Sequence, residues 1–182
     1  MATVIIRPND ITSSTGFDVS GATLLSNISD DDDGTRAVQN NTECSITGIA
    51  FANSTSYSGA TINSVTLSVF GSAGGRGSGP VITCVLKNGN STLQTSEFEY
   101  EEAGILSGAA YSTSLTPTIV DNLSVHISAD STGVAIYEVY ITVNYNAAPT
   151  GYGNAVIGVA ATSIVSFNGI ATANIANVIG VS

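Results

Sequence analysis

The sequence predicts an all-β protein, an antiparallel β-sandwich of the jelly-roll type with a short apolar repeat tail at its C-terminus. Three observations support this prediction. Residues 62–70 and 134–145 alternate between apolar and polar side chains, which is the period of a half-buried strand. Turn-rich stretches separate several apolar runs, and no helical period precedes residue 150. Only 10% of the chain is charged although 43% is hydrophobic, and the Ser, Thr, Asn and Gly that fill the difference disfavour helix interiors.

The first predicted strands are short. Residues 3–7 form one that ends at Pro8, because proline cannot donate a hydrogen bond to a ladder. Residues 45–51 form the next, and the uneven spacing of their apolar positions indicates a β-bulge. We expect residues 9–43 between these strands to be mostly irregular.

Regular alternation predicts the remaining strands. Within 134–145, Tyr137, Val139 and Ile141 are expected on one face and Glu138 and Tyr140 on the other. Residues 96–110 are polar and acidic and are expected to form a long loop or a short helix. The further strands are expected at 62–70, 81–87, 111–116 and 121–127, with turn chemistry at 87–90.

Residues 1–147 are expected to form the sandwich domain and residues 148–182 the tail, because alternation stops at a stretch with Pro and Gly near residue 150. Segment 160–170 is repeated by 171–181, and neither contains an acidic, basic or histidine residue. Apolar residues three apart indicate helical or 3₁₀ turns that stop at glycines, with short stacked strands as the alternative. The tail is too short for its own core, so we expect it to dock on the sandwich or on another copy. Its interface residues would be Ile164, Phe167, Ile170, Ile175, Val178 and Val181.

The charge of the chain argues against several classes of partner. The formal net charge is −10, from 14 acidic and four basic residues. The basic residues are Arg7, Arg36, Arg76 and Lys87, which are scattered along the sequence. Nucleic acids and anionic membranes both require clustered cations, so neither is an expected partner. The start of the chain lacks the basic and long apolar regions of a signal peptide, so we expect synthesis in a cytoplasm.

Isolated chemical groups do not form a recognisable active site. His126 stands alone on a predicted strand, and no zinc or hydrolase motif includes it. Cys44 and Cys84 are far apart in the sequence. We expect them to be free buried thiols, and one disulfide between them is the alternative. The glycine-rich segment 71–79 lacks the Gly-Lys-Ser/Thr ending of a phosphate-binding loop, so Arg76 at its centre is expected to contact a neighbouring subunit.

Two acidic runs are candidate sites. No metal or cofactor is expected. If Ca²⁺ were bound, the aspartates of the first run would be its ligands. Otherwise the first run is expected to be a solvated loop or a contact for a basic partner. The second run places carboxylates at alternate positions around Phe98, as on a solvent-facing strand. The chain contains no Trp, which argues against a glycosidase and weakens an ordinary carbohydrate-binding module. The runs are Asp30, Asp31, Asp32 and Asp33, and Glu97, Glu99, Glu101 and Glu102.

The order of elements resembles a β-sandwich module of virion proteins in tailed bacteriophages. The residues that carry the resemblance are 4–9, 30–35, 60–69 and 135–145, together with the tail motifs at 167–170 and 175–181. The resemblance implies a structural role in a virion, made in the host bacterial cytoplasm, with no catalytic residues.

We interpret the sequence as a non-enzymatic capsid cement or decoration protein. It would bind the major capsid protein on the outer surface of the head and form a homo-oligomer, expected to be a trimer, with avidity from many copies. The alternative is a tail-fibre or baseplate protein that recognises host surface glycans. A Ca²⁺-dependent lectin or small hydrolase is a third possibility, and it would depend on Asp31 and Asp32.

Overall fold

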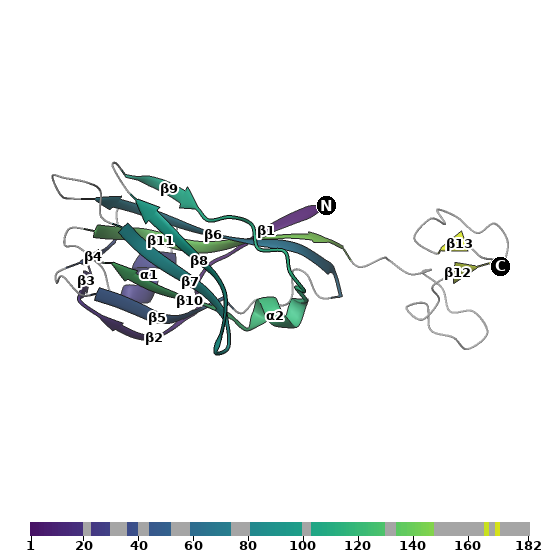
Figure 1. Cartoon of the computed structure of the whole chain (residues 1–182), viewed down its shortest axis with the longest axis horizontal. Helices are drawn as coiled ribbons and strands as arrows, with labels where there is room; N and C mark the ends of the chain where they lie inside the picture. Colours follow the sequence, from purple (N-terminus) through teal and green to yellow (C-terminus); the bar gives the residue numbers. More distant parts are fainter. Residues whose placement is uncertain are drawn as a thin grey trace. The chain divides into compact units, whose positions relative to one another are not determined.

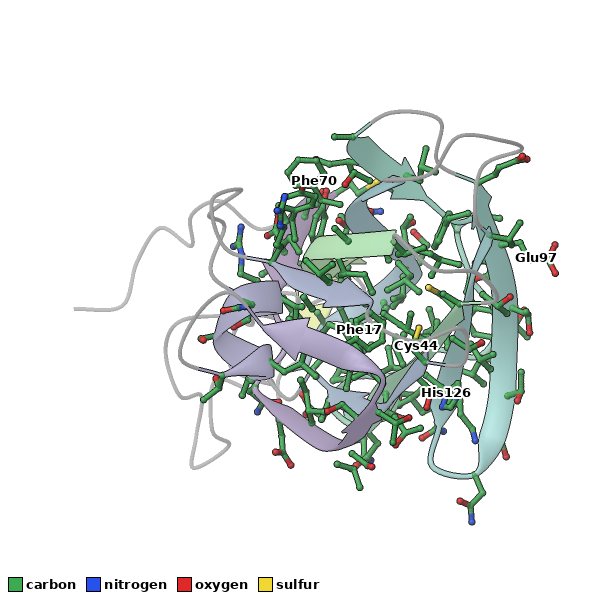
Figure 2. The ribbon with its side chains drawn as sticks, turned by 90° about the vertical axis from the view of Figure 1, so that its left-hand side faces the viewer. Phe17, Cys44, Phe70, Glu97 and His126 are labelled. Carbon is green, nitrogen blue, oxygen red and sulfur yellow. The ribbon has the colours of Figure 1, made fainter. Side chains whose placement is uncertain are left out.

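Two compact units make up the computed structural model of the chain, Met1–Asn146 and Ala147–Ser182. The first unit is a sandwich of two antiparallel β-sheets (Figures 1 and 2), so the predicted fold class is confirmed. The structure describes residues 1–19, 23–29, 36–39, 44–51, 59–73, 81–99, 103–129, 134–147, 166–167 and 170–171.

The six-stranded sheet is built around β11 (Val134–Asn146). β6 (Thr61–Ala73) pairs with it along nearly its whole length, while β1 (Ala2–Ile6) and β4 (Ala37–Gln39) share its other edge. β3 (Phe17–Val19) extends the sheet beyond β4, and β9 (Gly104–Ser107) extends it beyond β6.

The five-stranded sheet has the order β2-β5-β10-β7-β8. β7 and β8 form a hairpin that turns at Gly89, whose φ of 56° lies in the left-handed region that glycine enters without strain. The predicted turn chemistry at 87–90 therefore lies at this hairpin. The strands are β2 (Asp10–Thr15), β5 (Cys44–Ala50), β7 (Val81–Asn88), β8 (Ser91–Glu99) and β10 (Leu123–Ala129).

Several edge elements were predicted wrongly. The stretch 9–43, expected to be irregular, contains β2, β3, β4 and the helix α1 (Leu24–Ser29). The stretch 96–110, expected to be a loop or helix, contains the end of β8 and all of β9. Edge strands have solvent on more than one side and therefore tolerate polar residues at nearly every position. β2 shows this clearly, since it has five exposed residues and one half-buried residue.

The strand predicted at 111–116 is also corrected. Tyr111 forms only an isolated bridge to Val65, and the chain then enters the helix α2 (Pro117–Asp121). Thr116 caps this helix, because its hydroxyl accepts a hydrogen bond of 3.2 Å from the Ile119 N–H. Pro117 follows in the first turn, where the missing N–H costs nothing.

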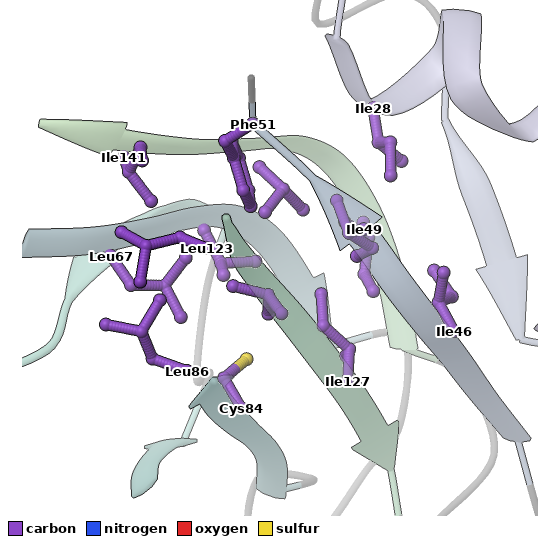
Figure 3. Packing of buried hydrophobic residues seen from close by; sticks show 14 of the residues in the cluster. Ile28, Ile46, Ile49, Phe51, Leu67, Cys84, Leu86, Leu123, Ile127 and Ile141 are labelled. Atoms are coloured by element: carbon purple, nitrogen blue, oxygen red, sulfur yellow. The ribbon is translucent and has the colours of Figure 1, made fainter. Parts of the chain in front are cut away.

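The two sheets and both helices enclose one hydrophobic core (Figure 3). Alternate residues of each central strand point inward, and Ile28 of α1 joins the same cluster as Ile46 and Ile49 of β5. Burial of each such side chain contributes about 1.5–3 kcal/mol, which makes this core the main source of stability. The large side chains with almost no exposed surface include Phe51, Ile82, Leu86, Leu123, Ile127, Ile136 and Ile141.

The second unit contains a short antiparallel pair, β12 (Ser166–Phe167) with β13 (Ile170–Ala171). At these positions the chain forms strands, which was the alternative, rather than the helical turns first expected. Of the predicted interface residues, the structure describes only the backbone of Phe167 and Ile170, so the docking role of 148–182 stays a prediction. No helix among the described residues is long and apolar enough to cross a membrane.

The first testable prediction concerns the cysteines. Cys44 and Cys84 are both free and lie on β5 and β7, on either side of β10. Two strand spacings separate them by about 10 Å, which is too far for a disulfide. Cys44 is 5% exposed, Cys84 is 0% exposed, and burial raises the pKa of both thiols.

A thiol reagent should therefore label neither cysteine in the folded protein at neutral pH, and should label both after unfolding in urea. The measurement is the time course of labelling, with Cys44→Ala used to assign the two signals. Rapid labelling of native Cys84 would contradict the packing described here.

Candidate functional site

Most of the residues that the sequence singled out lie outside the described part of the chain. Glu97 and Glu99 lie on β8, and His126 lies on β10. Among the described residues, no group of three or more His, Cys, Asp or Glu side chains is arranged to hold a metal ion. The residues outside the described ranges are Asp30, Asp31, Asp32, Asp33, Arg76, Glu101, Glu102, Ile164, Ile175, Val178 and Val181.

The outer face of the five-stranded sheet carries mainly hydroxyl side chains. His126 lies half-buried on this face, opposite Val85 of β7. The pairing places one row across all five strands: Thr15, Ser45, Ser128, Thr83 and Glu97. This face is mainly hydrophilic, and Val81 and Val85, both half-buried, add apolar surface to it.

The outer face of the six-stranded sheet is different, because aromatic side chains lie on it. A register shift between Ile136 and Glu138 inserts Tyr137 as an extra residue in β11. Phe70 of β6 pairs with Glu138, and the Tyr137 ring stacks on the Phe70 ring. The two centroids are 4.8 Å apart with an interplanar angle of 25°. Both residues are half-buried, so part of the pair faces solvent.

Polar contacts hold the Tyr137 ring in place. Its hydroxyl accepts a hydrogen bond of 3.3 Å from Arg36 Nη1 and lies 3.2 Å from Ser72 Oγ. The guanidinium carbon of Arg36 lies 6.0 Å from the ring centroid, at the outer limit of a cation–π contact. A ring held by contacts of this kind loses little freedom when a ligand binds.

An ion pair lies beside this stack. Arg7, just after β1, donates from Nε to Glu138 Oε1 at 2.8 Å. The Glu138 side chain is 9% exposed and that of Arg7 is 34% exposed. A carboxylate this deeply buried requires such a partner, because desolvation without one is costly.

Two exposed isoleucines also lie on this face. Ile105 of β9 pairs with Phe70 and is 54% exposed, and Ile5 of β1 is 49% exposed. Apart from Met1, these are the exposed large hydrophobic residues in the described part of the chain. Ile105 lies beside the stack, whereas Ile5 pairs with Thr142, four residues along β11 from Glu138. An exposed apolar side chain next to aromatic rings indicates a binding surface.

We call the row formed by Arg36, Tyr137, Phe70 and Ile105 the aromatic band. It runs from Arg36, just before β4, across β11 and β6 to β9, and three strand spacings make it ~14 Å long. Figure 2 shows that Phe70 belongs to a different layer from Glu97 and His126, which lie on the other sheet. The band is therefore separate from the acidic residues that the sequence singled out.

A groove of about 430 Å³ runs between β8 and β9, where one edge of each sheet meets the other. Residues 94–99 line one side and residues 106–109 the other. Gln94 Nε2 donates to the Ala109 carbonyl oxygen at 3.0 Å, which joins the two sides at one point. Close by, a Cβ on Gly108 would lie 2.5 Å from Ser96 Oγ, so a larger residue here would have to displace the Ser96 hydroxyl.

Sequence reasoning missed the aromatic band because the bulge leaves only a weak signal in the sequence. Strict alternation places Tyr137 on the same face as Val139, which points into the core. The extra residue reverses the phase, so that Ile136 and Val139 are both fully buried while Tyr137 joins Glu138 outside. The detectable signal was two consecutive large side chains, Ile136 and Tyr137, in an otherwise alternating strand.

No family model matches the chain, and no curated protein matches it. Several solved structures of carbohydrate-binding modules do. The C-terminal CBM6 of LamC, a marine laminarinase from Zobellia galactanivorans, is 12% identical with a TM-score of 0.46, over 79% of this chain and 99% of that one. The CBM6cm-2 module from Cellvibrio mixtus lichenase 5A, solved with cellotriose, is 10% identical with a TM-score of 0.46, over 79% and 97%.

A third match is the CBM36-1 domain of a multidomain xylanase from the hindgut metagenome of Trinervitermes trinervoides. It is 16% identical with a TM-score of 0.36, over 79% of this chain and 97% of that domain. At such identities and scores, the likeness does not extend to the ligand of any of these modules.

The prediction of a capsid cement protein is wrong. The matched structures named above are carbohydrate-binding modules, and none of them is a capsid protein. The capsid and decoration roles that followed from the phage resemblance are wrong as well, and only the β-sandwich is confirmed. The expected homotrimer stays a prediction.

The second testable prediction concerns the ion pair. Arg7→Ala leaves the Glu138 carboxylate buried without its 2.8 Å partner, so the free energy of unfolding should fall by about 2 kcal/mol. Arg7→Ala combined with Glu138→Gln should recover part of the loss, because a neutral amide is less costly to bury. Urea unfolding measures both, with Lys87→Ala as the control for removal of a cation. A loss for Arg7→Ala no larger than that of the control would show that the pair contributes nothing.

Proposed function

We propose that this chain is a non-catalytic carbohydrate-binding module that holds a glycan on the aromatic band. The observation that carries the proposal is the stacked pair of Phe70 and Tyr137, which is half-buried on a sheet face between Arg36 and Ile105. This proposal keeps glycan recognition, which was the alternative interpretation of the sequence, but not the role in a phage particle.

The composition of the band suits a sugar ring. A pyranose has faces made of C–H groups and a rim of hydroxyl groups. Phe70 and Tyr137 cover each other's inner faces, so the side that each ring turns away from the other is the surface that attracts such C–H groups and provides hydrophobic contact. At ~14 Å, the band has the length of a short linear oligosaccharide rather than of a single sugar.

Hydrogen-bonding groups surround the rings. Arg36, which is exposed, has several N–H donors, and the Tyr137 hydroxyl both donates and accepts. Glu138 is largely buried and paired with Arg7, so the hydrogen-bonding groups open to a sugar here are those of Arg36 and Tyr137. A few polar groups placed around an apolar surface are the usual composition of a small-molecule site.

The same face supports binding rather than turnover. Glycoside hydrolysis uses two carboxyl groups about 5–10 Å apart on either side of the bond that breaks. Among the side chains that the structure describes on this face, Glu138 is the one carboxylate, and Arg7 holds it in an ion pair. We therefore assign Glu138 a structural role, in which it holds Arg7 beside the stacked rings.

The third prediction tests this proposal. Phe70→Ala and Tyr137→Ala should each weaken glycan binding about tenfold or more, because each removes one stacking surface. Tyr137→Phe keeps the ring and should have a smaller effect. A panel of neutral and acidic polysaccharides in affinity electrophoresis identifies the ligand, and calorimetry with its oligosaccharides gives the affinities.

Thr83→Ala is the matched control, because Thr83 is half-buried on the outer face of the other sheet. Urea unfolding of each variant confirms that it folds. Retention of no polysaccharide by the wild-type protein, or wild-type affinity in Phe70→Ala, would overturn the proposal.

A further inference from the structure

We propose that the groove between β8 and β9 binds an extended peptide from another protein, in which basic and apolar residues alternate. The peptide would add to the free edge of β8 as a short strand. This inference is independent of the aromatic band, because it uses different residues and a different kind of ligand.

β8 has an open edge. It is the last strand of its sheet, and the described part of the chain supplies no strand on its other side. An edge strand presents a row of backbone N–H and C=O groups that an extended peptide can pair with. β9 is likewise the last strand of the opposite sheet, so the groove lies between two sheet edges.

The groove has room for such a ligand and a defined end. Its volume of about 430 Å³ lies within the usual range for ligand sites. The hydrogen bond from Gln94 to Ala109 and the contact of Gly108 with Ser96 join its two sides. Peptide pairing is therefore confined to the stretch of β8 beyond this junction, residues 97–99.

The side chains of β8 define the pattern of the peptide. Phe98 points inward and is 4% exposed, while Glu97 and Glu99 point outward and are exposed. An added strand alternates in the same way, so its inward side chains would meet Phe98 and the half-buried Leu106 across the groove. Its outward side chains would lie beside Glu97 and Glu99, where opposite charge is favoured.

The negative charge beside the groove favours a basic peptide as its ligand. A basic peptide meets two carboxylates on β8 and a chain with a net charge of −10, so attraction assists both encounter and register. The C-terminal tail of another copy does not fit, since residues 148–182 contain no Lys or Arg. The same carboxylates disfavour pairing of β8 with β8 of a second copy, because like charges would then face each other.

The test uses the full chain and a fluorescently labelled peptide of alternating Lys and Val. Fluorescence anisotropy should show saturable binding. A peptide of the same composition with all lysines first and all valines after should bind at least tenfold more weakly, because it cannot present both faces. A peptide of alternating Glu and Val should not bind.

The double variant Glu97→Lys/Glu99→Lys should lose at least tenfold affinity for the Lys-Val peptide and gain affinity for the Glu-Val peptide. Asp10→Lys is the matched control, because Asp10 is an exposed acid on β2 at the other edge of the same sheet. Amide hydrogen exchange should slow in 96–99 when the peptide binds. Equal binding of the alternating and block peptides, or wild-type affinity in the double variant, would overturn the proposal, and so would no binding at all.

Discussion

β6 and β11 pair along almost the whole of their 13 residues each, and this pairing is the constraint on which the rest of the structure depends. Val65, Leu67 and Val69 of β6 and Val139, Ile141 and Val143 of β11 point into the core with at most 3% of their surface exposed. This continuous apolar layer is the surface on which the opposite sheet packs. The other strands of the six-stranded sheet attach to β11 or β6, directly or through β4.

The same pairing creates the candidate site through one irregularity. The bulge at Tyr137 lets Ile136 and Val139 both point inward, and it brings Tyr137 out beside Phe70 and Glu138. A regular strand would have placed Tyr137 inside and removed the stacked pair. The bulge therefore keeps the core filled and at the same time turns an aromatic side chain to the outer face. Bulges commonly redirect side chains in this way at functional sites.

Whether a strand could be predicted from the sequence depends on its position in the sheet. The alternation of 62–70 and 134–145 revealed the central strands, because a strand with one buried face leaves that period in the sequence. β2 and β8 have an open edge and carry Ser, Thr, Gln and Glu, so their hydrophobic signal is too weak to identify.

The candidate site could not be predicted from the sequence for a different reason. Phe70 and Tyr137 are 67 positions apart and meet only through the register of two strands, and one inserted residue reverses which side chains share a face. The acidic residues were chosen as candidates because adjacent charged residues can be recognised in the sequence alone. Glu97 and Glu99 do lie at a groove, but the aromatic band lies on the other sheet.

The most direct test of the central claim is to map the glycan on the protein by NMR. Backbone amide shifts would be followed while the oligosaccharide identified by affinity electrophoresis is added. We expect the largest changes at Phe70, Tyr137 and Ile105, with little change at His126 or Ser128 on the opposite sheet. Changes confined to the five-stranded sheet or to the groove, with Phe70 and Tyr137 unaffected, would contradict a glycan site on the aromatic band.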